Sequence, residues 1–220
     1  QLMITKKPFA IIPARVGSQR IKLKNIRLFN NKPLIYWTIK SAVECKIFSK
    51  IYVSTDSVII KNELNKFKKF KDKINFLDRP KKLSGSKTKT STLIKYLIKK
   101  NSLEKKFFDF ILLQPTSPLR KKEHINKMWN IYKKYSLNDF FSVSEKINKL
   151  KINKKNRDIF CGEKKINSIK LKSIYQNGSI YIKSLQSFKK DSNFVTKNSA
   201  LYLMNKKVSL DVDTLKDLEK

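Results

Sequence analysis

Short, largely apolar runs alternate with segments of helical periodicity through the first two thirds of the chain. The runs lie at Phe9–Pro13, Lys50–Thr55, Ile74–Leu77, Phe110–Leu113 and Phe140–Val143. Helical spacing covers Lys32–Val43, Asp56–Phe67, Thr90–Lys100 and Glu123–Tyr135, with Asp56 as an expected N-cap. Strands that are apolar on both faces need cover on both sides, so the pattern predicts an α/β fold with a mainly parallel sheet between helices.

The alternation stops between residues 145 and 174, where Lys, Asn and Ile dominate. We interpret this segment as either a short antiparallel excursion or a mobile loop. Strands are expected again at Gly178–Ile182 and Ala200–Met204, followed by extended chain over Val208–Asp213. Thr214 is predicted to cap a last short helix, with Leu215 and Leu218 facing inward. The length of 220 residues fits a single domain, 1–220.

The charge is strongly basic: 51 Lys and Arg against 17 Asp and Glu give a formal net charge of +34. Such a balance first indicates a nucleic-acid or acidic-membrane binder. Nearly all of the cations are lysines, however, whereas base readers and phosphate clamps favour the planar fork of arginine. We therefore interpret most of the charge as solvated lysine, do not expect nucleic acid as the partner, and treat the few arginines as informative.

Several kinds of chemistry find no support in the sequence. His124 is the single histidine, and Cys45 and Cys161 form no CxxC pair, which argues against a histidine triad, a zinc site or a disulfide scaffold. No apolar run approaches the roughly 20 residues of a membrane span. We expect a soluble, cytoplasmic protein without a membrane partner.

In parallel sheets, ligands bind beyond the carboxyl ends of the strands. This rule selects the loops Arg15–Asn25, Thr55–Asp56, Arg79–Pro80 and Gln114–Arg120. The first loop is rich in cations, and Arg15 and Lys24 offer a fork and a point charge for a phosphate chain. It is neither a Walker A loop nor a GxGxxG turn, and a solvated basic loop remains the alternative.

Two further segments carry candidate chemistry. Asp211 and Asp213 lie at i and i+2 of an extended segment, so both carboxylates face one side and could bind Mg²⁺ together with phosphates. The alternative is that one caps a helix and the other pairs with a lysine. The loop Gln114–Arg120 is stiffened by two prolines and offers neutral donors and one fork to a hydroxylated, carboxylated ligand, or else forms a turn in which Arg120 pairs locally.

Taken in order, these segments resemble the acylneuraminate cytidylyltransferase family, which includes CMP–N-acetylneuraminic acid synthetase and its close relatives. The matching stretches run from Ile11 to Glu219: IPARVGSQRIKLKNI, KPLIYWTIKSA, IYVSTD, RPKKL, ILLQPTSPLR, NGSIYI and SLDVDTLKDLE. The resemblance implies a Rossmann-like three-layer nucleotidyltransferase fold. It also implies a homodimer formed through the segment at about 145–174, which is shortened in this sequence.

The resemblance implies a role for eleven residues. Those expected at the nucleotide CTP are Arg15, Ser18, Lys24, Asn25, Arg79 and Thr90, with Arg79 on the base. Those expected at the acceptor sugar are Gln114, Tyr181 and Phe194. The residues expected to bind Mg²⁺ (or Mn²⁺) are Asp211 and Asp213. Arg15, Lys24 and Asp213 form the expected catalytic set.

The implied activity is transfer of a cytidylyl group from CTP to a nonulosonic acid of the sialic or legionaminic type, with release of pyrophosphate, in the synthesis of a cell-surface polysaccharide. Two alternatives remain: a nucleotidyltransferase for another acidic sugar such as keto-deoxy-octulosonate, and a catalytically idle basic homologue that binds nucleic acid. The sequence departs from the family at three places. Gln19 replaces a basic residue, Ser86 stands near the position of an Asp, and Ser168–Lys172 lacks an Arg-Gln pair.

Overall fold

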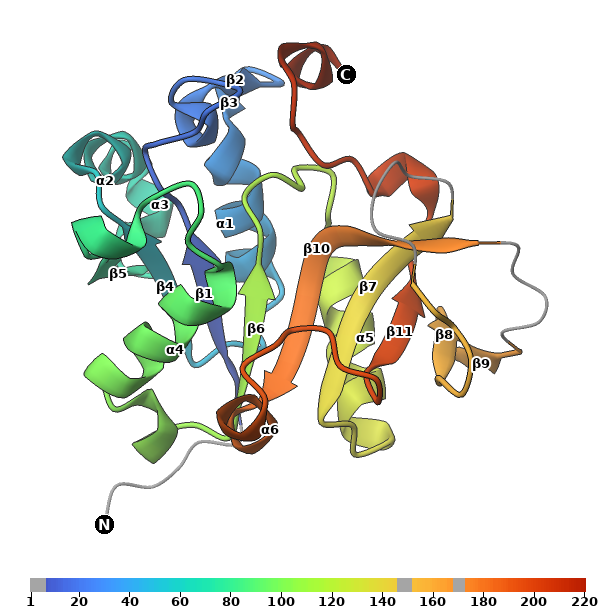
Figure 1. Ribbon diagram of the computed structural model, residues 1–220. Coiled ribbons are helices and arrows are strands. Elements are labelled where there is room, and N and C mark those ends of the chain that lie inside the picture. The colour runs from blue at the N-terminus through green and yellow to red at the C-terminus, as the bar shows by residue number, and fades with distance from the viewer. Residues whose placement is uncertain (1–6, 146–151, 168–172) are drawn as a thin grey trace.

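A computed structural model describes residues 7–145, 152–167 and 173–220 (Figure 1). Nine strands of the described chain form one sheet in the order β5-β4-β1-β6-β10-β7-β11-β8-β9. Their bounds are β1 Phe9–Pro13, β4 Lys50–Thr55, β5 Asn75–Asp78, β6 Asp109–Leu113, β7 Asp139–Glu145, β8 Ile159–Cys161, β9 Lys164–Ile166, β10 Ile174–Ser184 and β11 Ala200–Leu203. A separate small hairpin pairs β2 (Leu28–Phe29) with β3 (Lys32–Pro33).

The sheet is mainly parallel, as the alternation predicted. Strand β1 pairs in parallel with β4 and β6, β4 with β5, and β11 with both β7 and β8. Strand β10 runs antiparallel between β6 and β7, and β9 runs antiparallel to β8. The carboxyl ends of the parallel strands therefore share one edge of the sheet, the upper edge in Figure 1.

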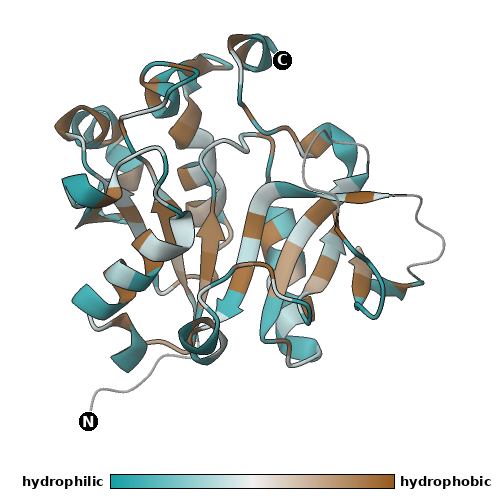
Figure 2. Ribbon diagram, viewed as in Figure 1, coloured by the Kyte–Doolittle hydropathy of each residue, from teal (hydrophilic) through white to brown (hydrophobic). Residues whose placement is uncertain are grey.

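Helices cover both faces of the sheet, which gives three layers (Figure 1). One face packs against α1 (Leu34–Glu44), α2 (Val58–Asn65), α3 (Lys68–Lys71) and α5 (Lys122–Lys134). The other packs against α4 (Thr90–Lys100) and α6 (Leu185–Lys190). Figure 2 shows the apolar strands enclosed by helices with polar outer faces.

The strands are apolar at successive positions because each face has its own core. In β1, Ala10 and Ile12 pack on the side of α1, whereas Phe9 and Ile11 pack on the side of α4. All four side chains are fully buried. A half-exposed strand would have alternated polar and apolar residues, so this run alone required helices on both sides.

The predicted elements match the observed ones within a few residues, but several details were wrong, among them Lys32–Pro33, which form β3 rather than the start of a helix, and α3, which was not predicted. Ser57, not Asp56, caps α2, because the Ser57 hydroxyl accepts a hydrogen bond from the Ile60 amide. The final 3₁₀ helix at Leu215–Glu219 buries no residue, and the Leu215 side chain is exposed, whereas Leu218 packs against a small core cluster. Helix α6 had no counterpart in the prediction.

The interruption at residues 145–174 is in part the expected antiparallel excursion, since β8 and β9 form a hairpin there. The missing Arg-Gln pair at Ser168–Lys172 falls outside the described residues. The predicted strand at Gly178–Ile182 is longer than expected and bends at Gly178, which has a φ of +74°. The pairing register with β7 shifts between Gln176 and Tyr181, so the bend turns the start of β10 toward the carboxyl edge of β7.

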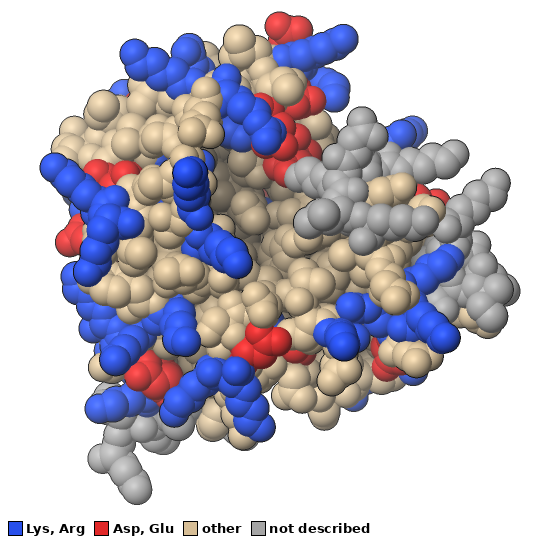
Figure 3. All heavy atoms as spheres, viewed as in Figure 1, with Lys and Arg blue, Asp and Glu red and all other residues tan. Residues whose placement is uncertain are grey.

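In the described part of the chain, every helix is too short or too polar to cross a membrane. Lysine and arginine side chains spread over much of the face seen in Figure 3 and surround a hollow at its centre. That distribution agrees with the interpretation of most of the charge as solvated lysine.

Candidate active site

A cavity of about 320 Å³ lies at the carboxyl edge of the parallel strands. Its walls come from the loops after β1, β5 and β6, from the start of α4 and from the segment before the final 3₁₀ helix. It brings together nine predicted site residues: Arg15, Ser18, Lys24, Asn25, Arg79, Thr90, Gln114, Asp211 and Asp213. Segments some 200 residues apart in the sequence thus meet at the edge where ligands of parallel sheets bind.

Two hydrogen bonds fix the course of the loop after β1. The Val16 amide donates to Asp56 Oδ1 over 3.0 Å, and Asn25 Nδ2 donates to the Arg15 carbonyl over 2.9 Å. Asp56 stands at the end of β4, so a carboxylate from the neighbouring strand sets the path of this loop. Asn25 is itself buried and fixes the backbone from which Arg15 projects.

Asp213 forms the centre of a charged cluster at the cavity rim. Lys24 Nζ lies 3.1 Å from Asp213 Oδ1 and donates a second hydrogen bond to the Val212 carbonyl over 2.8 Å. Arg20 Nη1 lies 3.0 Å from the other oxygen, Asp213 Oδ2. One carboxylate therefore holds two cations from the loop after β1, which agrees with the alternative that an aspartate pairs with a lysine and leaves the metal role open.

The segment that carries Asp211 and Asp213 is anchored at both ends. The Val212 amide donates to the Thr116 carbonyl over 2.8 Å, and the fully buried Val212 side chain packs with Ile21 and Phe29. With Val212 turned inward, the two carboxylates on either side of it line the cavity, as the i, i+2 spacing predicted. Upstream, Asn177 Nδ2 donates to Ser209 Oγ over 3.1 Å and ties the segment to β10.

Arg79 also lines the cavity, and its side chain is buried. Its Nε and Nη2 atoms donate to the Leu83 carbonyl over 3.0 and 2.7 Å. Burial lowers the pKa of the guanidinium, and the nearby Asp56 carboxylate opposes that shift. The side chain is thus fixed against its own loop, and the hydroxyl residues Thr88 and Thr90 line the same cavity.

In the loop after β6, Gln114 and Arg120 have different surroundings. Gln114 lines the cavity, whereas the Arg120 side chain is almost completely buried behind the loop. Arg120 donates from Nη1 to the Ser179 carbonyl over 2.8 Å and from Nη2 to Thr38 Oγ1 over 2.7 Å. Its burial lowers the pKa of the guanidinium to about 9. Local pairing accounts for only one contact, from Nη1 to the Gln114 carbonyl over 3.2 Å, and Arg120 mainly braces the loop against α1 and β10.

Tyr181 and Phe194 lie side by side but not among the lining residues of this cavity. Their ring centroids are 5.5 Å apart, and Tyr181 stacks on Phe141. The Tyr181 hydroxyl accepts a hydrogen bond from Gln176, and burial raises its pKa to about 12. Their assignment to the acceptor stays a prediction.

The cavity fits a magnesium ion that is shared with a nucleotide. Asp211 and Asp213 supply hard oxygen ligands, and the described residues contain no group of three or more His, Cys, Asp or Glu suited to a metal. Mg²⁺ commonly binds through one or two carboxylates and completes its shell with waters and substrate phosphates. The residues present thus suit that mode rather than a cage made by the protein alone.

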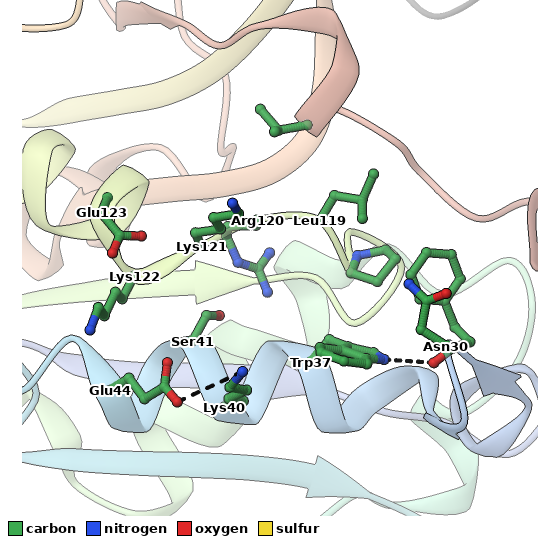
Figure 4. A pocket seen from close by; sticks show the side chains of 13 residues that line it. Asn30, Trp37, Lys40, Ser41, Glu44, Leu119, Arg120, Lys121, Lys122 and Glu123 are labelled. Carbon is green, nitrogen blue, oxygen red and sulfur yellow. Dashed lines mark hydrogen bonds and ion pairs between the residues drawn. The ribbon is translucent and has the colours of Figure 1, made fainter. Parts of the chain in front are cut away.

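A second cavity of about 450 Å³ lies between α1 and the segment that leads into α5 (Figure 4). Trp37 and Lys40 of α1 face the segment from Leu119 to Glu123 across it, and Trp37 Nε1 donates to the Phe29 carbonyl over 2.8 Å. Of the residues singled out in the sequence it includes Arg120 alone, which already braces the neighbouring loop. The candidate chemistry therefore lies in the smaller cavity at the sheet edge.

Sequence reasoning missed three contributors: Asp56 as the clamp of the first loop, Arg20 on Asp213, and Thr88 in the cavity lining. The rule that ligands bind beyond the carboxyl ends of the strands did select Thr55–Asp56, so the Asp56 side chain could have been assigned to the site. No local signal distinguished Thr88 from other loop hydroxyls.

Comparison with known proteins shows which family this sequence matches. The sequence model described as cytidylyltransferase matches residues 9–219. An N-acylneuraminate cytidylyltransferase of Streptococcus agalactiae serotype V is 32% identical in an alignment that covers 96% of this chain and 51% of that protein. The CMP-N,N'-diacetyllegionaminic acid synthase of Legionella pneumophila is 31% identical over 93% of this chain and 90% of its own length. The chain spans about half the length of the first of these curated relatives.

Among solved structures, the fold matches a CMP:2-keto-3-deoxy-manno-octonic acid synthetase complexed with CTP, with a TM-score of 0.71 and 14% identity over 97% of this chain and 96% of that one. A 4-diphosphocytidyl-2C-methyl-D-erythritol synthase from Anaerococcus prevotii has a TM-score of 0.65 and 14% identity, over 97% and 95% of the two chains. The identities are low, so these matches confirm the predicted nucleotidyltransferase fold and nothing more.

Proposed function

The chain belongs to the cytidylyltransferase family, and from this premise we propose that it transfers a cytidylyl group from CTP to a nonulosonic acid and releases pyrophosphate. The observation that carries the proposal is the cavity at the sheet edge. Its lining combines Arg15, Lys24 and Arg79 with the carboxylates of Asp211 and Asp213. A triphosphate nucleotide needs fixed cations for its phosphates, and a shared divalent cation needs the carboxylates.

The nucleotide is bound by the residues on either side of the cavity. Arg15 and Lys24 hold the phosphates, with Ser18 and Asn25 beside them, and the buried Arg79 with Thr90 holds the base. Because Arg79 is already fixed against Leu83, it offers a rigid partner with little further loss of side-chain entropy. As pyrophosphate departs, Arg15 and Lys24 stabilise its growing negative charge.

The acceptor enters from the side of Gln114, and its anomeric hydroxyl attacks the α-phosphorus. Positioning and charge neutralisation carry the reaction, without a covalent enzyme intermediate. Mg²⁺ (or Mn²⁺), when bound by Asp211 and Asp213, supplies Lewis-acid neutralisation of the phosphates. Asp213 completes the catalytic set because its carboxylate at the rim favours loss of the proton from the attacking hydroxyl. Tyr181 and Phe194 are proposed to flank the acyl group of the sugar.

Relatives favour an acceptor of the sialic or legionaminic type. Proteins named for N-acylneuraminate and diacetyllegionaminate are 31–32% identical to the chain, and a pseudaminic acid cytidylyltransferase of Campylobacter jejuni is 26% identical. We further propose a homodimer, a cytoplasmic location and a role in making cell-surface polysaccharide, all of which rest on the resemblance alone.

The direct test is pyrophosphate release by the purified chain with CTP, Mg²⁺ and a panel of acids: sialic, legionaminic, pseudaminic and keto-deoxy-octulosonic. Mass spectrometry identifies the CMP-sugar. We expect turnover with a nine-carbon acid and little with the eight-carbon one. Turnover with the eight-carbon acid alone would replace the acceptor assignment. The absence of any product, together with binding to DNA or RNA that weakens steeply with salt, would favour the idle homologue.

A further inference from the structure

Arg20 is the one arginine of the loop after β1 that touches an acidic member of the site. Its Nη1 atom lies 3.0 Å from Asp213 Oδ2, while Lys24 Nζ lies 3.1 Å from Asp213 Oδ1. Each oxygen of the Asp213 carboxylate therefore already has a cation next to it. A divalent ion needs direct access to such an oxygen, at about 2.0–2.1 Å for Mg²⁺.

The two cations are held with very different strength. The Lys24 side chain is 13% exposed and donates a second hydrogen bond to the Val212 carbonyl. The Arg20 side chain is 68% exposed. Within the described residues, its polar contact is the ion pair with Asp213. An exposed pair of this kind contributes at most about 1 kcal/mol and weakens with salt. When a metal approaches, Arg20 is the cation that leaves.

Resting on the proposed function, we propose that Arg20 is an exchangeable counter-ion of Asp213: it pairs with Asp213 Oδ2 in the nucleotide-free protein and moves to the triphosphate when CTP and the metal bind. No charge is left without a partner in this exchange. The Asp213–guanidinium pair is replaced by an Asp213–metal contact and a guanidinium–phosphate contact, for which the planar fork of arginine is well shaped. Figure 3 shows basic and acidic side chains next to each other at the upper margin of the hollow, beneath the C-terminal turn.

If Arg20 competes with the metal for Asp213, removal of the Arg20 charge should improve the binding of a divalent cation. In Arg20→Ala, Asp213 Oδ2 no longer has a competitor, so Mn²⁺ alone should bind to the nucleotide-free protein about three- to ten-fold more tightly than to wild type. The conservative Arg20→Lys variant restores a competing charge and should return the affinity to near the wild-type value. In the presence of saturating Mn²⁺, CTP should bind about three- to ten-fold more weakly to Arg20→Ala, because one phosphate contact is gone.

Electron paramagnetic resonance of free and bound Mn²⁺ measures the first effect without any turnover. Arg27→Ala is the matched control, because Arg27 carries the same charge in the same segment but donates from Nε to the Lys22 carbonyl. Its Mn²⁺ affinity should change less than two-fold. Asp213→Asn should abolish the difference between the Arg20 variants.

Three results would overturn the exchange: equal or weaker Mn²⁺ binding in Arg20→Ala, an equal gain in Arg27→Ala, or Mn²⁺ binding that does not depend on Asp213. These results are separate from a failure of the proposed function. A chain that releases no pyrophosphate with any acid on the panel contradicts the cytidylyl transfer, while the nucleotide-free Mn²⁺ titration still decides the role of Arg20.

Discussion

Two aspartate–lysine pairs stand at opposite edges of the sheet and differ most in burial. At the carboxyl edge, Asp213 and Lys24 are 39% and 13% exposed and 3.1 Å apart. At the amino edge, Asp139 at the start of β7 and Lys183 near the end of β10 are 8% and 0% exposed and 2.7 Å apart. Asp139 also accepts hydrogen bonds from Ser187 Oγ and Thr196 Oγ1.

The difference shows how burial separates a structural ion pair from one available to a ligand. Asp139 has its oxygens engaged by Lys183, Ser187 and Thr196 inside the fold, so no ligand can replace those partners without unfolding the region. Asp213 is bordered by a cavity and by the exposed Arg20, so its partners can be exchanged. Mutations should therefore affect stability at one edge and turnover at the other.

The largest effect should come from breaking the buried pair. Asp139→Asn leaves the Lys183 ammonium buried without a counter-charge, which should lower the free energy of unfolding by about 3–5 kcal/mol in urea titrations. Turnover per folded molecule should not change. The double variant Asp139→Asn/Lys183→Met removes both charges and should recover most of the loss.

Lys61→Met is the matched control for distance. Lys61 Nζ is also 2.7 Å from its partner, Asp78 Oδ1, but the two side chains are 31% and 81% exposed. Its loss should cost about 1 kcal/mol or less. A comparable loss in Asp139→Asn and Lys61→Met would remove burial as the explanation of the contrast.

The second-largest effect is expected at the carboxyl edge, where a substitution should lower turnover rather than stability. Asp213→Asn should lower kcat about 10²- to 10³-fold, the size expected when one electrostatic contact to a transition state is lost. The free energy of unfolding should fall by no more than about 1 kcal/mol, because the side chain is partly exposed and Lys24 keeps its bond to the Val212 carbonyl. Near-normal turnover would contradict the assignment of Asp213 to the catalytic set.

A third variant tests Asn177, whose loss should affect both stability and the site. Asn177 is fully buried; its Oδ1 accepts from Ser142 Oγ over 2.7 Å and its Nδ2 donates to Ser209 Oγ, just before Asp211. Asn177→Ala removes both hydrogen bonds and the one that the buried Ser179 amide donates to Asn177 Oδ1, which should cost about 1–3 kcal/mol of stability. It should also raise the Mg²⁺ concentration needed for half-maximal turnover, because the segment that carries the carboxylates loses an anchor.

Thr196→Val is the control for Asn177→Ala. It removes the hydrogen bond to Asp139 Oδ2 at the far edge, 3.0 Å long, and should lower stability with no change in the Mg²⁺ dependence. An equal shift of the Mg²⁺ dependence in both variants would show that the effect reflects general loosening of the fold rather than the anchor.

The sequence was sufficient for the sheet because each strand is defined by its own residues. Phe9–Pro13 and Phe110–Leu113 are apolar throughout, and burial on both faces follows without knowledge of their neighbours. It was insufficient where two side chains compete for one role. Asp56 and Ser57 are both good N-caps, and the choice between them depends on the Val16 amide, which is 40 residues away in the sequence.

The candidate site, too, was predictable from the sequence only in part. The family resemblance implied the nine residues that line one cavity, and the strand-end rule by itself selected the loops that hold six of them, since parallel strands end at a common edge. Burial of individual side chains was not predictable: Arg120 looked like a ligand fork but is enclosed by Thr38 and Ser179 from other elements. Leu215 was placed inward beside Leu218, but Leu215 is exposed and only Leu218 packs against the small cluster that contains Val212.

The smallest expected effect concerns Asp217, which connects the exposed end of the chain to Asp213. Its Oδ2 accepts hydrogen bonds from the Asp213 and Thr214 amides, over 3.1 and 2.9 Å. Burial acts to raise the pKa of the Asp217 carboxyl, but the hydrogen bonds from Lys220, Thr214 and Asp213 together outweigh it and hold the pKa well below its usual range. A depressed carboxyl pKa stabilises the fold above the unfolded-state pKa of about 3.9, and this contribution is lost as the pH falls toward the folded-state value.

Asp217→Asn should therefore lower the free energy of unfolding by about 0.5–1 kcal/mol at pH 6, the size of a helix-cap contribution, and by progressively less as the pH approaches 2. Urea titrations of the wild type and the variant at matched pH values measure this difference. Because the Asp213 carboxylate is held separately by Lys24, kcat at neutral pH should change less than about two-fold, far less than in Asp213→Asn. A loss of turnover as large as that of Asp213→Asn would mean that the position of Asp213 depends on its backbone amide rather than on the cations of the first loop.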